Sequence, residues 1–162
     1  MDGMQLLLGI LNWLHLVATV TWFGGITTNA IVLVPSMGAS LDPPTAGKFM
    51  NIYMKKFKPL VYISIIILIS TGLIITVLLN PLYLALSSEW AIILLIKHVF
   101  VALAVLATLY GFEVLAPKIA KLAAQGPSPE LAQLQKVQMT SVKMAVIIAF
   151  IILLLTGFQT AL

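Results

Sequence analysis

The fold is decided by residues 11–25, which read LNWLHLVATVTWFGG. They belong to an apolar run long enough to cross a bilayer, and a single histidine, His15, lies inside it. A side chain that can ionise is costly in hydrocarbon, so an intramembrane histidine is by default a candidate functional residue. The other histidine of the chain, His98, also lies inside an apolar run. We therefore expect the two histidines to act together at a metal, with haem iron as the first choice.

The composition around this stretch is typical of an integral membrane protein. The chain has 162 residues, of which 61% are hydrophobic and 9% charged, whereas a soluble domain needs a far more charged surface. It has no cysteine, which excludes disulfides, thiolate metal sites and c-type haem attachment. The net charge of +4 comes from lysines that mostly flank apolar runs, so it sets topology and does not indicate a nucleic-acid partner.

Four apolar segments are long enough to span about 30 Å of hydrocarbon at about 1.5 Å per residue. They cover residues 5–34, 59–80, 90–115 and 139–161. We expect an all-α, up-down bundle of four transmembrane helices that forms one domain over residues 1–162.

The connectors carry helix start and stop signals. Asp42-Pro43-Pro44-Thr45 predicts a short amphipathic helix, after which Pro59 opens the second span. Asn80-Pro81 predicts the end of that span, and Ser87-Ser88-Glu89 predicts the cap of the third helix. Gly126-Pro127-Ser128-Pro129-Glu130 predicts a fourth helix that begins in water and continues into the membrane.

Lysine placement predicts the orientation of the chain in an inner cell membrane. Eight of the nine lysines lie in or beside the first and third connectors. They are Lys48, Lys55, Lys56, Lys58, Lys118, Lys121, Lys136 and Lys143. By the positive-inside rule both connectors are cytoplasmic and both termini lie on the outer side.

An internal repeat relates the two halves of the chain. A shift of 85 residues brings residues 58–72 onto residues 143–157, with the first lysine and the final Thr-Gly pair identical. A shift of 82 brings residues 32–35 onto residues 114–117, and both segments end in proline. The repeat predicts two parallel helix hairpins related by an axis along the membrane normal.

The two histidines fall at matching places in this repeat. A shift of 83 brings His15 onto His98, and their depths, about ten and about eight residues into parallel spans, agree within a few Å. The first and third helices of an up-down bundle face each other across its core. Two imidazoles at equal depth on opposing helices meet the requirement for bis-histidine ligation of one b-type haem.

Other residues are assigned to the cofactor by their position. Thr71-Gly72 and Thr156-Gly157 reach a similar depth, where glycine would clear a flat macrocycle and threonine can bond a ring nitrogen or its own backbone. Lys97 can extend outward and neutralise a haem propionate. Trp22 is included as a further cofactor-binding residue of the first helix.

Each of these residues also has a plainer interpretation. A lone intramembrane histidine can serve as a hydrogen-bond partner between helices, and Thr-Gly pairs are common close-packing points in lipid. Lys97 at a helix start can be a headgroup anchor, and Trp22 can be an interfacial or core aromatic.

Copper is the competing metal. Cu(I) prefers soft ligands, and methionine is the only soft ligand that the chain offers. Five methionines fall on the predicted cytoplasmic side, away from both histidines: Met37, Met50, Met54, Met139 and Met144. No Met-x-x-Met or His-Met cluster lies within a span, which counts against copper transport.

The pattern Leu14-His15 followed by Thr21-Trp22-Phe23-Gly24-Gly25 resembles the first helix of two families of membrane proteins. They are the CopD-type copper-resistance proteins and the HemJ-type protoporphyrinogen oxidases. Lys97 and Val114-Leu115-Ala116-Pro117 also resemble the HemJ third helix. The resemblance implies a bundle of several spans, and its HemJ side implies b-type haem on His15. Two departures are the absence of arginine, which porphyrin-handling relatives tend to use, and the second histidine, His98.

The first hypothesis is therefore a b-type haem between His15 and His98 that transfers electrons in the membrane, with quinol or another redox subunit as partner. A bis-histidine iron has no open position for oxygen chemistry, so an enzyme comes second. That alternative is a HemJ-type oxidase in which His15 binds haem and Lys97 is a substrate or proton partner. A CopD-type copper permease and a metal-free structural subunit follow. The lipid bilayer is a partner in every case, and a homo-oligomer stays open.

Overall fold

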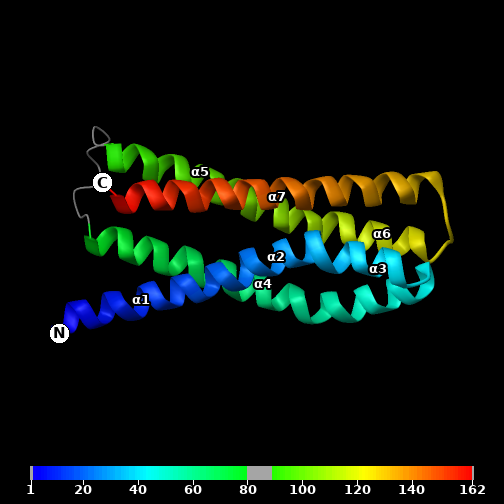
Figure 1. The fold of residues 1–162 in the computed structure, drawn as a ribbon, viewed down its shortest axis with the longest axis horizontal. Coiled ribbons are helices and arrows are strands. Elements are labelled where there is room, and N and C mark those ends of the chain that lie inside the picture. The colour runs from blue at the N-terminus through cyan, green and yellow to red at the C-terminus, as the bar shows by residue number, and fades with distance from the viewer. Residues whose placement is uncertain (1, 80–88, 162) are drawn as a thin grey trace. The chain divides into compact units, whose positions relative to one another are not determined.

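The computed structural model describes residues 2–79 and 89–161 (Figure 1). Regular structure in these residues is helical throughout. Four helices are long and apolar enough to cross a membrane: Gly3–Ser40, Pro43–Leu78, Glu89–Ala123 and Pro129–Ala161. The predicted all-α membrane class is confirmed. The signals at Asn80-Pro81 and Ser87-Ser88 lie outside the described residues.

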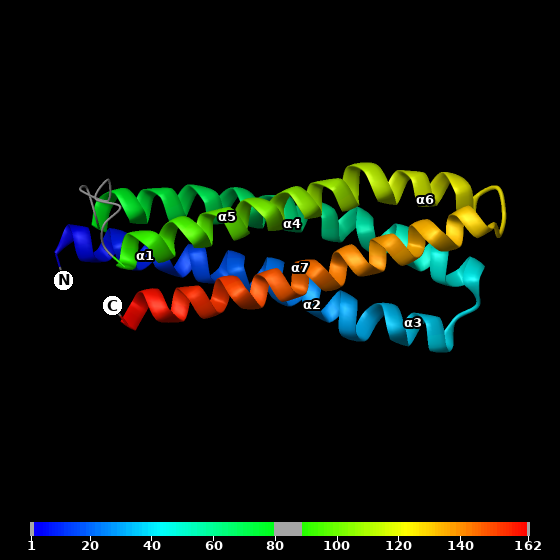
Figure 2. The ribbon, with the colours of Figure 1, turned by 90° about the horizontal axis from the view of Figure 1, so that it is seen from above.

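The chain divides into two compact units, Met1–Leu86 and Ser87–Leu162. The first unit is a helix hairpin whose outgoing arm is continuous (Figures 1 and 2). That arm consists of α1 (Gly3–Thr19), η1 (Val20–Gly24), α2 (Gly25–Thr28), η2 (Asn29–Leu33) and α3 (Val34–Ser40), where η marks π-helical turns. The returning arm is α4 (Pro43–Leu79), which packs against α1 and η1.

The second unit is also a hairpin. Its outgoing arm consists of α5 (Glu89–Tyr110), η3 (Gly111–Leu115) and α6 (Ala116–Ala123), and its returning arm is α7 (Pro129–Ala161). The two arms run side by side (Figures 1 and 2), and α5 and α6 both contact α7. The fourth helix therefore begins well before its apolar span, as predicted, and Ser128 Oγ caps it by accepting the Leu131 N–H at 3.1 Å.

Pro35 and Pro117 do not end their helices, although the first and third spans were expected to stop at residues 34 and 115. Each proline follows a π-helical turn, η2 in the first hairpin and η3 in the second. Proline lacks an N–H and its ring collides with the carbonyl four residues earlier. That carbonyl belongs to Ile31 or to Glu113, each inside the widened turn, so the π turn makes room for the ring and the helix continues.

The short amphipathic helix expected before Pro59 is not separate, and this prediction was wrong. The helix α4 is continuous from Pro43, and Pro59 lies inside it. Phe57 and Val61, on either side of the proline, are both buried, so packing against the first arm offsets the lost backbone bond. The predicted start is confirmed, because the Thr45 N–H donates to Asp42 Oδ2 at 3.2 Å. Hydrogen bonds from Thr45 lower the pKa of the Asp42 carboxyl.

The core of the first hairpin is a narrow stripe on each arm. On the outgoing arm Leu11, Ala18 and Trp22 are buried, and His15 lies between them at helical spacing. On α4 the stripe includes Val61 and Thr71. Many large apolar side chains outside these stripes are exposed, as expected for helices whose solvent is lipid.

Candidate functional site

His15 is bonded across the first hairpin to the opposite helix. Its Nδ1 lies 2.7 Å from the Thr71 Oγ1 atom, and Thr71 is only 4% exposed. The sequence spacing alone predicted that a threonine at this depth can bond a ring nitrogen or its own backbone. In the structure Thr71 does both, because its hydroxyl also lies 2.6 Å from the Ile67 carbonyl oxygen.

The second contact of Thr71 assigns the tautomer of His15. A hydroxyl has one hydrogen, and the Ile67 carbonyl can only accept, so the Thr71 hydroxyl donates to Ile67. The imidazole must then donate its Nδ1–H to Thr71. The lone pair of the neutral ring is consequently on Nε2, which is the arrangement that metal-binding histidines adopt when the other ring nitrogen is held by a neighbour.

Gly72 lies against the same imidazole. A Cβ atom added to Gly72 would be 3.4 Å from His15 Cε1 and 3.9 Å from His15 Nδ1. A Cβ alone would therefore make ordinary van der Waals contact with the ring, and a larger side chain would crowd it. This role differs from the one expected from sequence, where glycine was assigned to clear a macrocycle.

The corresponding residues of the second hairpin are arranged differently. His98 is exposed, and its Nδ1–H donates to the Leu94 carbonyl of its own helix at 2.7 Å. The Thr156 hydroxyl donates to the Ile152 carbonyl of its own helix at 2.8 Å. A Cβ added to Gly157 would meet no atom of the described residues within 4 Å. His98 nevertheless has the same tautomer as His15, with the lone pair on Nε2, because a carbonyl can only accept.

Lys97 makes the cross-helix polar contact of the second hairpin. Its Nζ donates to Gln159 Oε1 on α7 at 2.6 Å. Gln159 was not among the residues singled out from sequence, although a glutamine inside the apolar fourth span is a signal that could have identified it. Lys97 was expected to extend outward as a propionate partner, and here it pairs within its own hairpin.

The π-helical turns give a uniform offset between the two outgoing arms. η2 at residues 29–33 and η3 at residues 111–115 differ by 82 positions. At that offset the counterpart of His15 is Lys97, whereas the shift of 83 used in the sequence comparison aligned it with His98. One residue corresponds to a rotation of about 100° around a helix axis. Lys97 therefore occupies the position on the packed face that His15 occupies in the first hairpin.

Trp22 follows His15 by about two helical turns. Its side chain is only 8% exposed, and its indole N–H has no hydrogen-bond partner among the described residues. Two more buried polar atoms without such a partner, Thr27 Oγ1 and Asn29 Oδ1, lie further along the same arm. A buried donor that lacks an acceptor is costly in a membrane.

The structure thus brings together His15, Thr71 and Gly72 in one hairpin and Lys97 and Gln159 in the other. Within the described residues, no three His, Asp or Glu side chains form a metal-ion cluster. The candidate ligands for a cofactor are the imidazoles of His15 and His98, each with its Nδ1–H held by a neighbour. These groups fit a b-type haem, which takes axial imidazole nitrogen and carries two carboxylates that accept hydrogen bonds.

Comparison with known proteins adds a family but no activity. The search of curated proteins and the search of solved structures give no match. Residues 17–128 match a protein family described as a domain of unknown function, DUF4149. This match covers most of the first hairpin, including Trp22 and Thr71, and it continues through Lys97 and His98 in the second. The chain belongs to the DUF4149 family.

Proposed function

We propose that this protein binds a b-type haem through His15 and His98 and transfers electrons within the membrane. The observation that carries the proposal is the bond from His15 Nδ1–H to Thr71, whose own hydroxyl proton goes to Ile67. This arrangement fixes the ring and directs its lone pair to Nε2, as an axial ligand requires. When bound, the haem iron supplies one-electron chemistry.

His98 is the second proposed ligand because its tautomer also carries the lone pair on Nε2. Its ring is fixed only by its own helix, so we expect a weaker and more adjustable ligand than His15. Trp22 is kept as a proposed cofactor-binding residue because it lies on the same arm as His15, about two helical turns further along. Quinol or a redox subunit is the proposed electron partner.

The proposed orientation has both termini on the outer side of an inner cell membrane, since the lysines concentrate in the first and third connectors. Single cysteines at positions 2 and 126 test it with an impermeant thiol reagent. Labelling at position 2 alone in intact cells supports the orientation, and labelling at position 126 alone reverses it.

The axial ligands are tested by His98→Ala and by imidazole rescue. Loss of the low-spin haem spectrum in this variant, with recovery when imidazole is added to the buffer, supports bis-histidine ligation. An unchanged low-spin spectrum in His98→Ala would remove His98 from the site and leave Lys97 or water as the sixth ligand.

A HemJ-type oxidase of a porphyrin precursor is the second candidate. It is favoured by the offset of 82, which makes Lys97 the positional counterpart of His15. In this function His15 holds the haem and the Lys97 ammonium binds an anionic substrate or moves a proton. Growth of a strain that lacks protoporphyrinogen oxidase, when it expresses the unmodified chain, would support the oxidase. Failure to grow, with haem bound, would support the electron carrier.

A further inference from the structure

We propose that the lysine-rich part of α4 binds one anionic phospholipid, with an acyl chain against the Phe57 and Leu60 end of an aromatic groove and the phosphate held by Lys55 and Lys56. The groove is an open depression of about 380 Å³ on one face of α4. It is lined by Phe49, Ile52, Tyr53, Lys56, Phe57 and Leu60. These positions recur every three or four residues, so they form a continuous stripe along the helix.

Three aromatic rings give the groove a fixed wall. The Phe49 and Tyr53 ring centroids are 6.4 Å apart with planes at 9°, and the Tyr53 and Phe57 centroids are 5.1 Å apart with planes at 20°. Phe57 is only 7% exposed, and its ring lies where a Cβ on Gly25 would be, 2.7 Å from Cε2. Phe49, at the other end, is 42% exposed. The wall is therefore anchored on the first arm at one end and open at the other.

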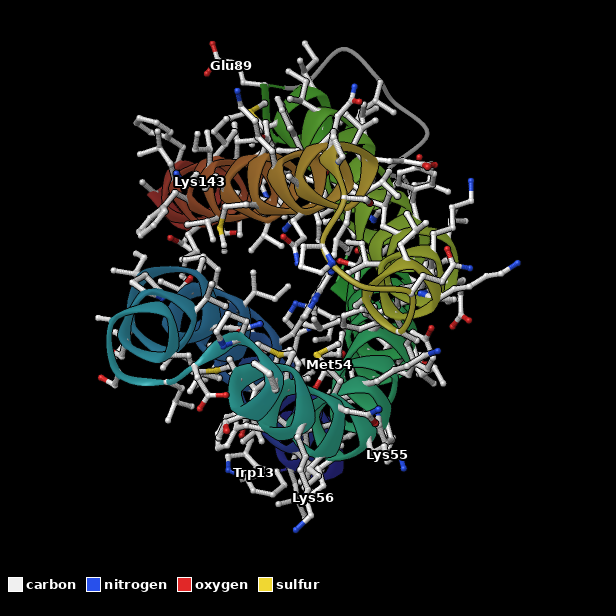
Figure 3. All side chains as sticks on the ribbon, turned by 90° about the vertical axis from the view of Figure 1, so that its right-hand side faces the viewer. Trp13, Met54, Lys55, Lys56, Glu89 and Lys143 are labelled. Carbon is white, nitrogen blue, oxygen red and sulfur yellow. The ribbon has the colours of Figure 1, made fainter. Side chains whose placement is uncertain are left out.

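The charge around the groove is of one sign. The helix α4 carries four lysines, at positions 48, 55, 56 and 58, and no acidic residue. Lys55 and Lys56 are exposed and project outward from the helix (Figure 3). Lys58 Nζ lies 5.6 Å from the centre of the Tyr62 ring. An apolar groove with Lys56 in its lining and further lysines on the same helix is complementary to an amphiphile that has an anionic head.

The depth of the groove matches the head of a lipid. The purely apolar part of α4 begins after Pro59, so the groove extends from the hydrocarbon boundary outward by about 15 Å at 1.5 Å per residue. Leu60 and Phe57 reach the acyl region, and Lys55 and Lys56 reach the phosphate level. Lysine clusters next to a span on its positive side are the usual electrostatic partners of anionic lipid heads.

The internal repeat shows that the second hairpin packs without a groove of this kind. At the shift of 85 that relates α4 to α7, Lys58 is retained as Lys143. The six groove positions become Leu134, Val137, Gln138, Ser141, Val142 and Ala145. None of these is aromatic or charged, yet α7 packs against its own partner helix. The groove is therefore an addition to the first hairpin, which points to a ligand.

The experiment measures phosphatidylglycerol bound to the full-length protein by native mass spectrometry from detergent, in competition with phosphatidylcholine. The test variant is Lys55→Gln with Lys56→Gln, and the matched control is Lys136→Gln with Lys143→Gln, which removes equal charge from α7. We expect one phosphatidylglycerol per chain, bound about 30-fold more weakly by the test variant and unchanged in the control. Tyr53→Leu should weaken binding while all lysines are kept.

Three outcomes overturn the proposal. Equal binding of the two lipids would show that no anionic head is recognised. Equal weakening by both double variants would show a general charge effect without a site. A lipid-free dimer that dissociates in Tyr53→Leu would assign the groove to a second copy of the chain. Circular dichroism of each variant confirms that it is folded before its lipid binding is compared.

Discussion

The two hairpins share a repeat but differ in which polar side chains cross between their helices. In the first, His15 bonds to Thr71 on the opposite helix, with Gly72 against the ring. In the second, His98 bonds to its own helix, and Lys97 makes the contact across to Gln159. A retained Thr-Gly pair therefore does not by itself retain a site. The deciding factor is which residue of the outgoing arm lies on the packed face.

The cross-helix bonds contribute little to stability. Side-chain hydrogen bonds between membrane helices average about 0.6 kcal/mol in double-mutant cycles, because the alternative states also find partners. Packing of the buried stripes holds each hairpin together. The bond from His15 to Thr71 matters because it selects one tautomer and one ring orientation, and a ligand must have both.

Removal of the His15 imidazole should cause the largest loss of haem affinity. It would show most clearly that the first hairpin supplies the stronger ligand. In His15→Ala we expect the affinity for haem to fall by roughly 100-fold or more, since loss of a ligand costs more than loss of its hydrogen-bond partner. The measurement is haem content after purification from haem-replete cells. Asn12→Ala is the control, because Asn12 is exposed and its side chain bonds to the Leu8 carbonyl of its own helix. Full haem content in His15→Ala would remove the first hairpin from the site.

A larger side chain should lower haem affinity at Gly72 but not at Gly157. In Gly72→Val the branched side chain meets the His15 ring, whose Cε1 lies 3.4 Å from an added Cβ. Overpacking of about 1–3 kcal/mol should lower haem affinity by about tenfold or more. Gly157→Val should leave it unchanged, since no atom of the described residues lies within 4 Å. Haem titrations of both proteins check this, and equal losses would contradict the difference between the hairpins.

The two threonines provide a sharper test of the tautomer. Thr71→Val keeps the shape but removes the acceptor for His15 Nδ1–H, so the imidazole becomes a less basic ligand. Haem affinity should fall by about tenfold, and the midpoint potential should rise because ferric iron loses donor strength. Thr156→Val, which removes only a bond to its own helix, should leave the potential unchanged. Redox titration gives the midpoint potential of each variant. A shift of the potential in Thr156→Val alone would mean that Thr156, and not Thr71, acts on the haem ligand.

The smallest expected effect concerns the pair in the second hairpin. A double-mutant cycle of Lys97→Met and Gln159→Leu should give a coupling of about 0.6 kcal/mol in the free energy of unfolding, with haem content unchanged in each variant. Loss of haem in Lys97→Met would mean that Lys97 serves the cofactor directly. The two hairpins would then contribute equivalent positions, as the offset of 82 allows, and the oxidase would become the first candidate.

Much of the fold was predictable because membrane helices are encoded by length and hydropathy, which require no tertiary information. The four spans, the cap at Asp42 and the early start of α7 are confirmed. The prolines were misjudged. A proline at position 35 or 117 predicts a helix end when only regular α geometry is considered, and a π-helical turn that ends two residues earlier removes the clash. Pro59 is tolerated because the buried residues on both sides of it pack well enough for α4 to continue through it.

The candidate site was predictable only in part. Membrane depth, which sequence gives, correctly brought His15 and Thr71 to one level. Rotation about the helix axis is harder to predict, because an error of one residue turns a side chain by about 100°. A difference of one residue in the offset decides whether the repeat aligns His15 with His98 or with Lys97. Gln159 was missed for a related reason, since its role depends on which face of α5 packs against α7.

The haem content of the purified, unmodified chain tests the central claim most directly. Protein from haem-replete cells should carry about one non-covalent b-type haem per chain, extractable by acid acetone and low-spin in its absorption spectrum. The His15→Ala protein, prepared in parallel, should be nearly colourless. A colourless unmodified protein, or a spectrum that His15→Ala leaves intact, would contradict the claim that His15, held by Thr71, is the ligand.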